Sequence, residues 1–344
     1  MQRHTRQWSS WRTPGRCILP VVIAMICAGA GVLAVSAPAP AASVSAWSIV
    51  PSANTSPAQD QRLTAVSCTS PTFCMAVGGY TTAGHAQALI EMWNGSSWSI
   101  VPSPNTSTSV DNDLNAVACA SASLCVAVGD TGGAHTLAES WNGSPWTLDT
   151  TVDPSATSNG FGGVACPSVT SCVAVGTYVS ASSYFQTLVE SWNGSTWSLV
   201  PSANTLATLE NLLNGVSCST PTSSVAVGTS QGATNRQTLT ESWDGTAWSV
   251  VTSPNTSSTV DNVLNNVTCT NPSFCMAVGY DDTGSSPPSL IEIWNGRAWS
   301  IVSGPNTSVP NSDENFLYGV SCTDPSNCVA AGHWSNTGDE KTPR

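Results

Sequence analysis

The sequence predicts an all-β fold built from repeats, and three observations lead to this prediction. A unit of about 51 residues recurs six times, with the pattern L-x-x-V-S-C-x5-C-x-A-V-G followed by L-x-E-x-W-N-G-x-x-W-S. Turn-forming residues interrupt the chain after every roughly ten residues, and no long apolar helical pattern follows residue 42. Each unit holds four short strand-like segments. Four strands at a fixed period predict a β-propeller of about six blades.

The second unit shows how the four strands are assigned. An alternating segment of small residues, 114–119, predicts the first strand, and 125–129 returns antiparallel to it. The segment 137–141 has the L-x-E-x-W pattern, and the Asn142-Gly143 turn connects it to a fourth strand at 146–148. The first strands of the six units begin near Leu63, Leu114, Phe161, Leu213, Leu264 and Leu317.

The two ends of the propeller region, predicted over residues 43–344, are out of phase with the repeat. The region opens with Trp47-Ser48-Ile49-Val50, which matches a fourth strand, and its last unit lacks the L-x-E-x-W segment. We expect the N-terminal strand to complete the last blade, because such pairing removes a free sheet edge. Two alternatives remain open: a three-stranded sixth blade, or a propeller of more than six blades of which this chain is a shortened copy.

The first 42 residues predict a secretory signal peptide. A basic stretch precedes an almost wholly apolar segment at 17–35, and Ala39-Pro40-Ala41 offers a cleavage site. The alternative is an uncleaved N-terminal anchor, although the apolar segment is near the lower limit for a membrane span. Either way we expect the propeller to be secreted or at the cell surface, with no other membrane contact, and to be a monomer.

The charge of the remaining chain is strongly negative. Four of the nine basic residues lie in the leader, so five basic residues face 21 acidic ones after its removal, a net charge of −16. Such a protein is repelled by nucleic acid and by anionic lipid. The charge is compatible with cation binding, and equally with a surface that serves only solubility.

Eleven of the 13 cysteines fall into the repeat. Paired cysteines at one spacing in an exported chain indicate disulfides, and no histidine recurs with them to suggest zinc. The predicted pairs are Cys68–Cys74, Cys119–Cys125, Cys166–Cys172, Cys269–Cys275 and Cys322–Cys328. Cys218 has no partner because Ser224 occupies the second position, so it is expected to be free, capped or buried.

The unit is similar to Kelch and BNR (Asp-box) propeller repeats. Residues 242–248, Ser-Trp-Asp-Gly-Thr-Ala-Trp, resemble an Asp-box shortened by one residue, and the other units have Asn at the Asp position. The V-S-C-x5-C-x-A-V-G and W-N-G-x-x-W motifs also resemble repeats of secreted, uncharacterised actinobacterial proteins. The resemblance covers nearly all of residues 47–334. It implies the fold but not the activity, because propellers host many unrelated functions.

No catalytic constellation emerges from the sequence. The sialidases among Asp-box propellers would imply an arginine triad, but Arg62, Arg236 and Arg297 fall at unlike positions of different units. A glycosidase needs two carboxylates at a defined separation. The glutamate of L-x-E-x-W recurs in five units, whereas a catalytic residue is normally singular, so we expect it to accept structural hydrogen bonds. These glutamates are Glu91, Glu139, Glu190, Glu241 and Glu292.

A second acidic series suggests a metal site. A carboxylate stands three residues before the first strand in five units, and a propeller would place these loops around one mouth of its central channel. The candidate Ca²⁺ ligands are Asp60, Asp111, Glu210, Asp261 and Glu314. The alternative is a set of solvated loop acids that never meet. No other cofactor is expected.

Residues that vary between units are the better candidates for a specific binding site. The candidates in the loops are His85, His135, Tyr184, Tyr280, Asp281 and Trp334. The repeated tryptophan pairs favour packing over a lectin site in every blade. We therefore predict a non-enzymatic propeller that binds an extracellular protein or glycan; the alternatives are a carbohydrate-active enzyme, similar to sialidases or glycosidases, and a lectin with one site per blade.

Overall fold

The regular structure of this protein consists of β-strands. The computed structural model describes residues 49–56, 60–282, 288–304, 306 and 314–335, and every regular element in them is a strand. The chain divides into two units, Met1–Val50 and Pro51–Arg344, and the second holds all of these strands. None of the described residues belongs to a helix that could cross a membrane. The predicted leader lies outside the described residues.

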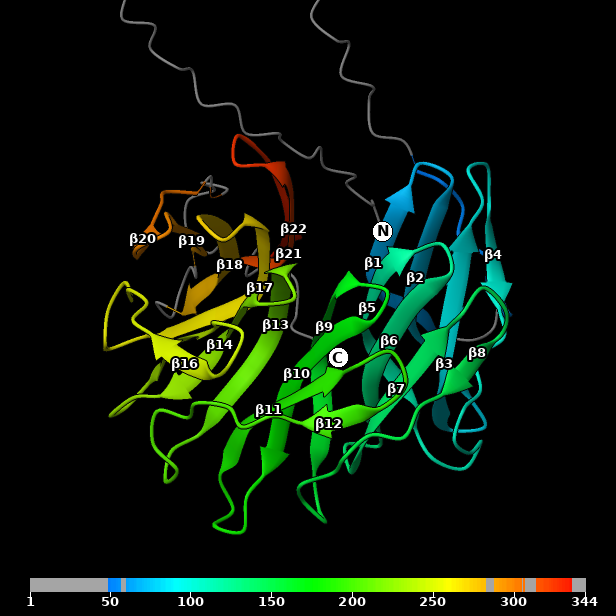
Figure 1. The fold of residues 1–344 in the computed structure, drawn as a ribbon, viewed down its shortest axis with the longest axis horizontal. Coiled ribbons are helices and arrows are strands. Elements are labelled where there is room, and N and C mark those ends of the chain that lie inside the picture. The colour runs from blue at the N-terminus through cyan, green and yellow to red at the C-terminus, as the bar shows by residue number, and fades with distance from the viewer. Residues whose placement is uncertain (1–48, 57–59, 283–287, 305, 307–313, 336–344) are drawn as a thin grey trace, which may run out of the picture. The chain divides into compact units, whose positions relative to one another are not determined.

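Four strand types recur along the chain (Figure 1). The first strands are β1 (Gln61–Ser70), β5 (Asp113–Ser121), β9 (Asn159–Ser168), β13 (Asn211–Thr220), β17 (Asp261–Asn271) and β21 (Glu314–Asp324). The second strands are β2 (Phe73–Thr82), β6 (Leu124–Thr131), β10 (Ser171–Val179), β14 (Ser223–Gln231), β18 (Phe274–Asp282) and β22 (Asn327–Ser335). The third strands are β3 (His85–Trp93), β7 (His135–Trp141), β11 (Phe185–Trp192), β15 (Arg236–Trp243) and β19 (Ser289–Trp294). The fourth strands are β4 (Trp98–Val101), β8 (Trp146–Leu148), β12 (Trp197–Leu199), β16 (Trp248–Val251) and β20 (Trp299–Ile301).

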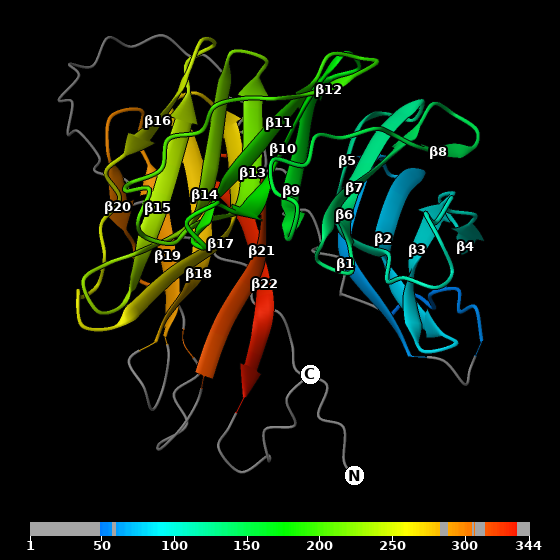
Figure 2. The same cartoon turned by 90° about the horizontal axis from the view of Figure 1, so that it is seen from below.

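These strands form five four-stranded sheets and one two-stranded sheet in the described residues, all antiparallel and each in sequence order. We call them blades 1 to 6 along the chain. The first strand of each blade contacts the first strand of the next, so these strands are innermost, and the fourth strands lie outermost (Figure 2). The predicted β-propeller class is confirmed, with five complete blades and one partial blade.

The repeated leucine and glycine are required where blades pack on each other. The first-strand residues Leu114, Phe161, Leu213 and Leu264 are at most 1% exposed and lie in the hydrophobic clusters between neighbouring blades. The glycine of A-V-G faces the first strand so closely that a Cβ on Gly129 would lie 1.8 Å from the Asp113 carbonyl oxygen. Any side chain there would push the hairpin apart, which explains why all six units keep this glycine.

The sixth blade has fewer strands than the sequence predicts. Only β21 and β22 belong to it in the described residues, and Ile49 and Val50 lie in no strand. The expected fourth strand at 47–50 is therefore not formed by its described half, and Trp47 and Ser48 lie outside the described residues.

The five predicted disulfides are present, each bridging directly opposed residues of a first and a second strand. Cys218 is the free cysteine of the described residues, and it lies opposite Ser224, whose hydroxyl donates to its sulfur at 2.8 Å. Burial raises the pKa of the Cys218 thiol to about 11, so the thiol stays protonated and unreactive at neutral pH.

We expect Ser224→Cys to form a sixth disulfide with Cys218 without any backbone change. The two residues already oppose each other as the bridged pairs do, and a loop this short stabilises by about 2 kcal/mol. Non-reducing mass spectrometry should show no free thiol in the variant, and the melting temperature should rise. A variant that keeps two reactive thiols under oxidising conditions would contradict the prediction.

Candidate functional site

The repeated glutamates are structural, as the sequence analysis expects. All five are at most 1% exposed, and their carboxylates accept hydrogen bonds from the linker that leads into their own blade. In four blades the donor is a serine hydroxyl: Ser52–Glu91, Ser103–Glu139, Ser202–Glu241 and Ser253–Glu292. In blade 3 the Val152 amide donates to Glu190 at 3.1 Å. Each glutamate therefore holds a linker onto a third strand, which explains its recurrence without catalysis.

Burial gives four of these carboxyls an unusual protonation range. It raises the pKa of Glu139, Glu190, Glu241 and Glu292 to about 7, because no basic group compensates for the loss of water. The Oε1 atoms of Glu241 and Glu292 have no hydrogen-bond partner in the described residues. An oxygen without a donor suits the neutral acid, so these carboxyls titrate near neutral pH and are mostly protonated below it.

The predicted calcium ligands are not gathered into one site. Asp111 accepts from the Ala86 amide at 2.8 Å, and Asp261 accepts from the Arg236 amide at 2.7 Å. Glu210 lies 4.0 Å from the Arg236 guanidinium, and Asp60 is exposed. No three acidic, histidine or cysteine side chains come together as a metal-binding group anywhere in the described part of the chain.

The side chain of the fifth candidate ligand, Glu314, lies outside the described residues. The calcium site therefore stays a prediction, while Asp111 and Asp261 hold their loops to backbone amides of the preceding blade.

The predicted loop candidates separate into anchors and one cluster. His85 lies 3.3 Å from Asp111, and His135 lies 2.8 Å from Asp153, so each histidine joins a third strand to the linker that follows its blade. Asp281 is 4% exposed, and burial raises its pKa. The three remaining candidates are Tyr184, which is 40% exposed next to a turn, Trp334, whose side chain lies outside the described residues, and Tyr280.

Tyr280 belongs to a group of four aromatic side chains on the inner strands of blades 5 and 6, which we call the aromatic cluster. Its members are Tyr280, Phe316, Tyr318 and His333. The rings of Tyr280 and Phe316 meet edge to face at 4.6 Å, and Tyr318 and His333 stack with centroids 5.5 Å apart. Phe316 joins the two pairs, at 5.2 Å from His333. Tyr318 is 51% exposed and His333 is also exposed, so one side of the cluster faces water.

The positions of the cluster are free to vary because the framework does not need aromatic residues there. Phe316 and His333 oppose each other across the first hairpin of blade 6. The corresponding opposed pairs in the other blades are Arg62–Gly79, Asp113–Asp130, Gly160–Thr177, Leu212–Thr229 and Val263–Tyr280. These pairs range from charged to small to aromatic, while the glycine beside them is constant and the leucine is replaced only by Phe161 in blade 3.

The opposed pair of blade 2 forms a second local group, which is polar. Arg62 donates to Asp113 at 2.6 Å, and Asn115 donates to Asp130 at 3.4 Å. Burial raises the pKa of the Asp130 carboxyl, and the neighbouring Asp113 adds to this effect. Asp113 and Asp130 are not repeated in other blades, so they are among the acids of this fold that a singular function could use.

The aromatic cluster and the polar group of blade 2 lie in strands, so a search of the variable loops did not find them. Each group is centred on the residue before the first-strand leucine and the residue after the second-strand glycine, and Tyr318 and Asn115 follow the leucine. Comparison of these two positions over the six units shows their variation, but only the antiparallel register shows that they face each other. The sequence-based candidates therefore include Tyr280 but not Phe316, Tyr318, His333, Asp113 or Asp130.

Comparisons with known proteins place the chain near propellers of several kinds. No protein-family model matches it, and no curated protein matches it by sequence. Among solved structures, a lectin from Aleuria aurantia is 12% identical, with a TM-score of 0.43 over 69% of this chain and 76% of that one. Sqt1 from Chaetomium thermophilum, bound to the N-terminus of ribosomal protein L10, is 12% identical, with a TM-score of 0.44 over 75% of this chain and 66% of that one.

A third similar structure is a polysaccharide lyase, an ulvan lyase. It is 10% identical, with a TM-score of 0.46 over 72% of this chain and 74% of that one. The three proteins bind or act on unlike molecules, and no function is transferred from them to this chain at such low similarity.

Proposed function

We propose that this protein is a non-enzymatic binding propeller that takes an extracellular glycan on the aromatic cluster. The observation that carries the proposal is the water-facing stack of Tyr318 and His333. No other blade has an aromatic residue at the Tyr318 position, and only blade 5, with Tyr280, has one at the His333 position. Sugar rings present apolar faces that stack on such side chains, and the hydroxyl and imidazole groups of the cluster can exchange hydrogen bonds with sugar hydroxyls.

The charge around the cluster favours a neutral or cationic sugar. Asp261, Asp282 and Arg236 lie close enough to Tyr280 to act on its hydroxyl, and burial with the nearby Tyr318 raises the pKa of that hydroxyl. The whole chain carries a net charge of −12. An acidic polysaccharide would be repelled by this field, whereas a neutral one would not.

We expect Tyr318→Ala to lower the affinity for the best ligand of a soluble oligosaccharide panel about tenfold. The loss of one stacked aromatic contact costs up to about 1.4 kcal/mol, which is a factor of ten in the dissociation constant. Titration calorimetry of wild type, Tyr318→Ala and His333→Ala would measure the change. Tyr184→Ala is the matched control, because Tyr184 is 40% exposed but lies in another blade.

Two results would overturn the proposal. Equal losses from Tyr318→Ala and Tyr184→Ala would mean that the cluster has no special part in binding. Turnover of any oligosaccharide in the panel by the wild-type protein would show an enzyme instead, and Asp113 and Asp130 would then be the first residues to replace.

A further inference from the structure

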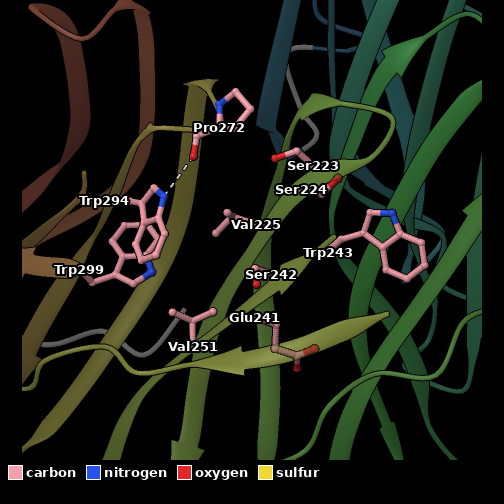
Figure 3. Close-up of a pocket in the computed structure, with 10 residues that line it drawn as sticks. All are labelled: Ser223, Ser224, Val225, Glu241, Ser242, Trp243, Val251, Pro272, Trp294 and Trp299. Carbon is pink, nitrogen blue, oxygen red and sulfur yellow. Dashed lines mark hydrogen bonds between the residues drawn. The ribbon is translucent and has the colours of Figure 1, made fainter. Parts of the chain in front are cut away.

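A pocket between blades 4 and 5 lies away from the aromatic cluster, near the outer strands. Its volume is about 100 Å³, and its walls include Val225, Ser242 and Val251 of blade 4 with Trp294 and Trp299 of blade 5 (Figure 3). The volume holds about three waters at roughly 30 Å³ each, which is also room for a group of four heavy atoms. The pocket therefore suits the end of a small chemical group rather than a whole sugar.

The acid that borders this pocket is directed away from it. Glu241 lines part of the wall, but its carboxylate accepts hydrogen bonds from Ser202 and Ala203 of the linker between blades 3 and 4. The Trp294 indole is also occupied, because it donates to the Pro272 carbonyl at 3.2 Å (Figure 3). The groups left to bind a ligand include two donors, the Ser242 hydroxyl and the Trp299 indole N–H, and one acceptor, the Oε1 atom of Glu241.

At the interface between blades 2 and 3, the equivalent serine and tryptophan donate to an acid. There, Asp149 accepts from the Ser140 hydroxyl at 2.8 Å and from the Trp197 indole at 3.1 Å. Ser140 and Ser242 are the residues next to the last tryptophan of their third strands, and Trp197 and Trp299 begin the fourth strand of the following blade.

Between blades 4 and 5 there is no such acceptor, because this position of the repeat holds valine, as it also does in blades 1 and 3 (Val101 and Val200). Val251 stands where Asp149 stands, directly after the exposed residue of the fourth strand, and in Figure 3 it lies between Ser242 and Trp299. Neither Ser242 nor Trp299 makes a side-chain hydrogen bond with any described residue. The same pair of donors therefore faces a pocket with a valine methyl in place of an oxygen.

We propose that this pocket binds the acetamido group of an N-acetylated sugar. The single carbonyl oxygen would accept from Ser242 and Trp299, whereas Asp149 accepts from its two donors with separate oxygens, Oδ1 and Oδ2. The methyl group would pack on Val225, Val251 and Trp294. A neutral acceptor is favoured over a carboxylate because no basic side chain lines the pocket and the protein is acidic. The proposal is independent of the aromatic cluster and adds a second subsite.

The test is titration of the ¹⁵N-labelled protein with N-acetylglucosamine, glucosamine, acetamide and acetate, observing the tryptophan indole resonances by NMR. We expect saturable shifts of the Trp299 indole with N-acetylglucosamine and acetamide, and none with glucosamine. Ser242→Ala should weaken both at least fivefold, because a hydrogen bond contributes about 1 kcal/mol. Val251→Asp should abolish them, because its own carboxylate would take the two donors.

Each other outcome overturns the proposal. Absence of a saturable Trp299 shift would mean that the pocket holds only water, and stronger binding of acetate would mean an anion site. An unchanged affinity in Ser242→Ala would remove the hydroxyl from recognition even if Val251→Asp failed to fold. Tyr318→Ala should leave these shifts unchanged. The experiment therefore tests binding in the pocket separately from binding on the aromatic cluster.

Discussion

We expect the protein to be more stable at pH 5 than at pH 8, and the buried glutamates to cause the difference. Glu139, Glu190, Glu241 and Glu292 have pKa values near 7 in the folded chain, against an ordinary value of 4.5. Between these values the folded chain holds protons that the unfolded chain releases. The stabilisation is therefore complete below about pH 4.5 and is lost as the pH rises through 7. Each glutamate contributes on the order of 1–3 kcal/mol.

Glu241→Gln isolates one of these four contributions. Glutamine is a permanently neutral copy of the protonated acid, and its carbonyl can still accept from Ser202 and Ala203. The variant should match the wild type at pH 5 and exceed it at pH 8 by roughly 1–3 kcal/mol in the free energy of unfolding. Denaturant unfolding at the two pH values measures both differences.

Asp244→Asn is the control for this experiment. Asp244 is an exposed turn residue, and hydrogen bonds from Thr246 and Ala247 lower its pKa to about 2, well below the range of the measurement. Asparagine occupies the same turn position in the other complete blades, so the change should leave the pH dependence intact. Equal destabilisation by Glu241→Gln at both pH values would show instead that the buried group is ionised.

The period of the sequence was sufficient to predict the blades, because each blade is formed by consecutive residues. A hairpin such as β1–β2 needs only contiguous residues, and the spacing of Cys68 and Cys74 places them opposite each other across its turn. The role of the repeated glutamates also followed from recurrence. Their serine partners could have been found too, because the linker serine and the glutamate, such as Ser103 and Glu139, recur together at a nearly constant separation.

Features that join different blades could not be read from one unit. The aromatic cluster needs Tyr280 from blade 5 and Phe316 from blade 6 to meet, which depends on how two sheets pack. The predicted ring of loop acids failed to assemble in the described residues for the same reason. Asp111 and Asp261 lie at matching sequence positions, but each is satisfied by an amide of the preceding blade before it can reach a common centre.

Replacing one buried loop asparagine should lower the free energy of unfolding more than replacing any single residue of the proposed sites. Asn211 is fully buried, and its Oδ1 accepts from the amide and hydroxyl of Thr205 at 2.9 and 2.7 Å. Its Nδ2 donates to the carbonyl groups of Leu206 and Leu209. One side chain thus fixes the linker that enters blade 4. Asn211→Ala leaves these groups without hydrogen-bond partners in a buried site that water does not reach. We expect the free energy of unfolding, measured by chemical denaturation, to fall by about 3–5 kcal/mol.

Gln61→Ala is the matched control in blade 1. Gln61 makes the same kind of bonds, with the Thr55 amide and the Ser56 carbonyl at 2.7 Å each, but it is only half-buried. Water can replace a partly exposed amide, so this change should cost roughly 1 kcal/mol. If the two variants lost equal stability, burial of Asn211 would not be the cause. The large effect would then belong to the linker conformation, which both side chains hold in the same way.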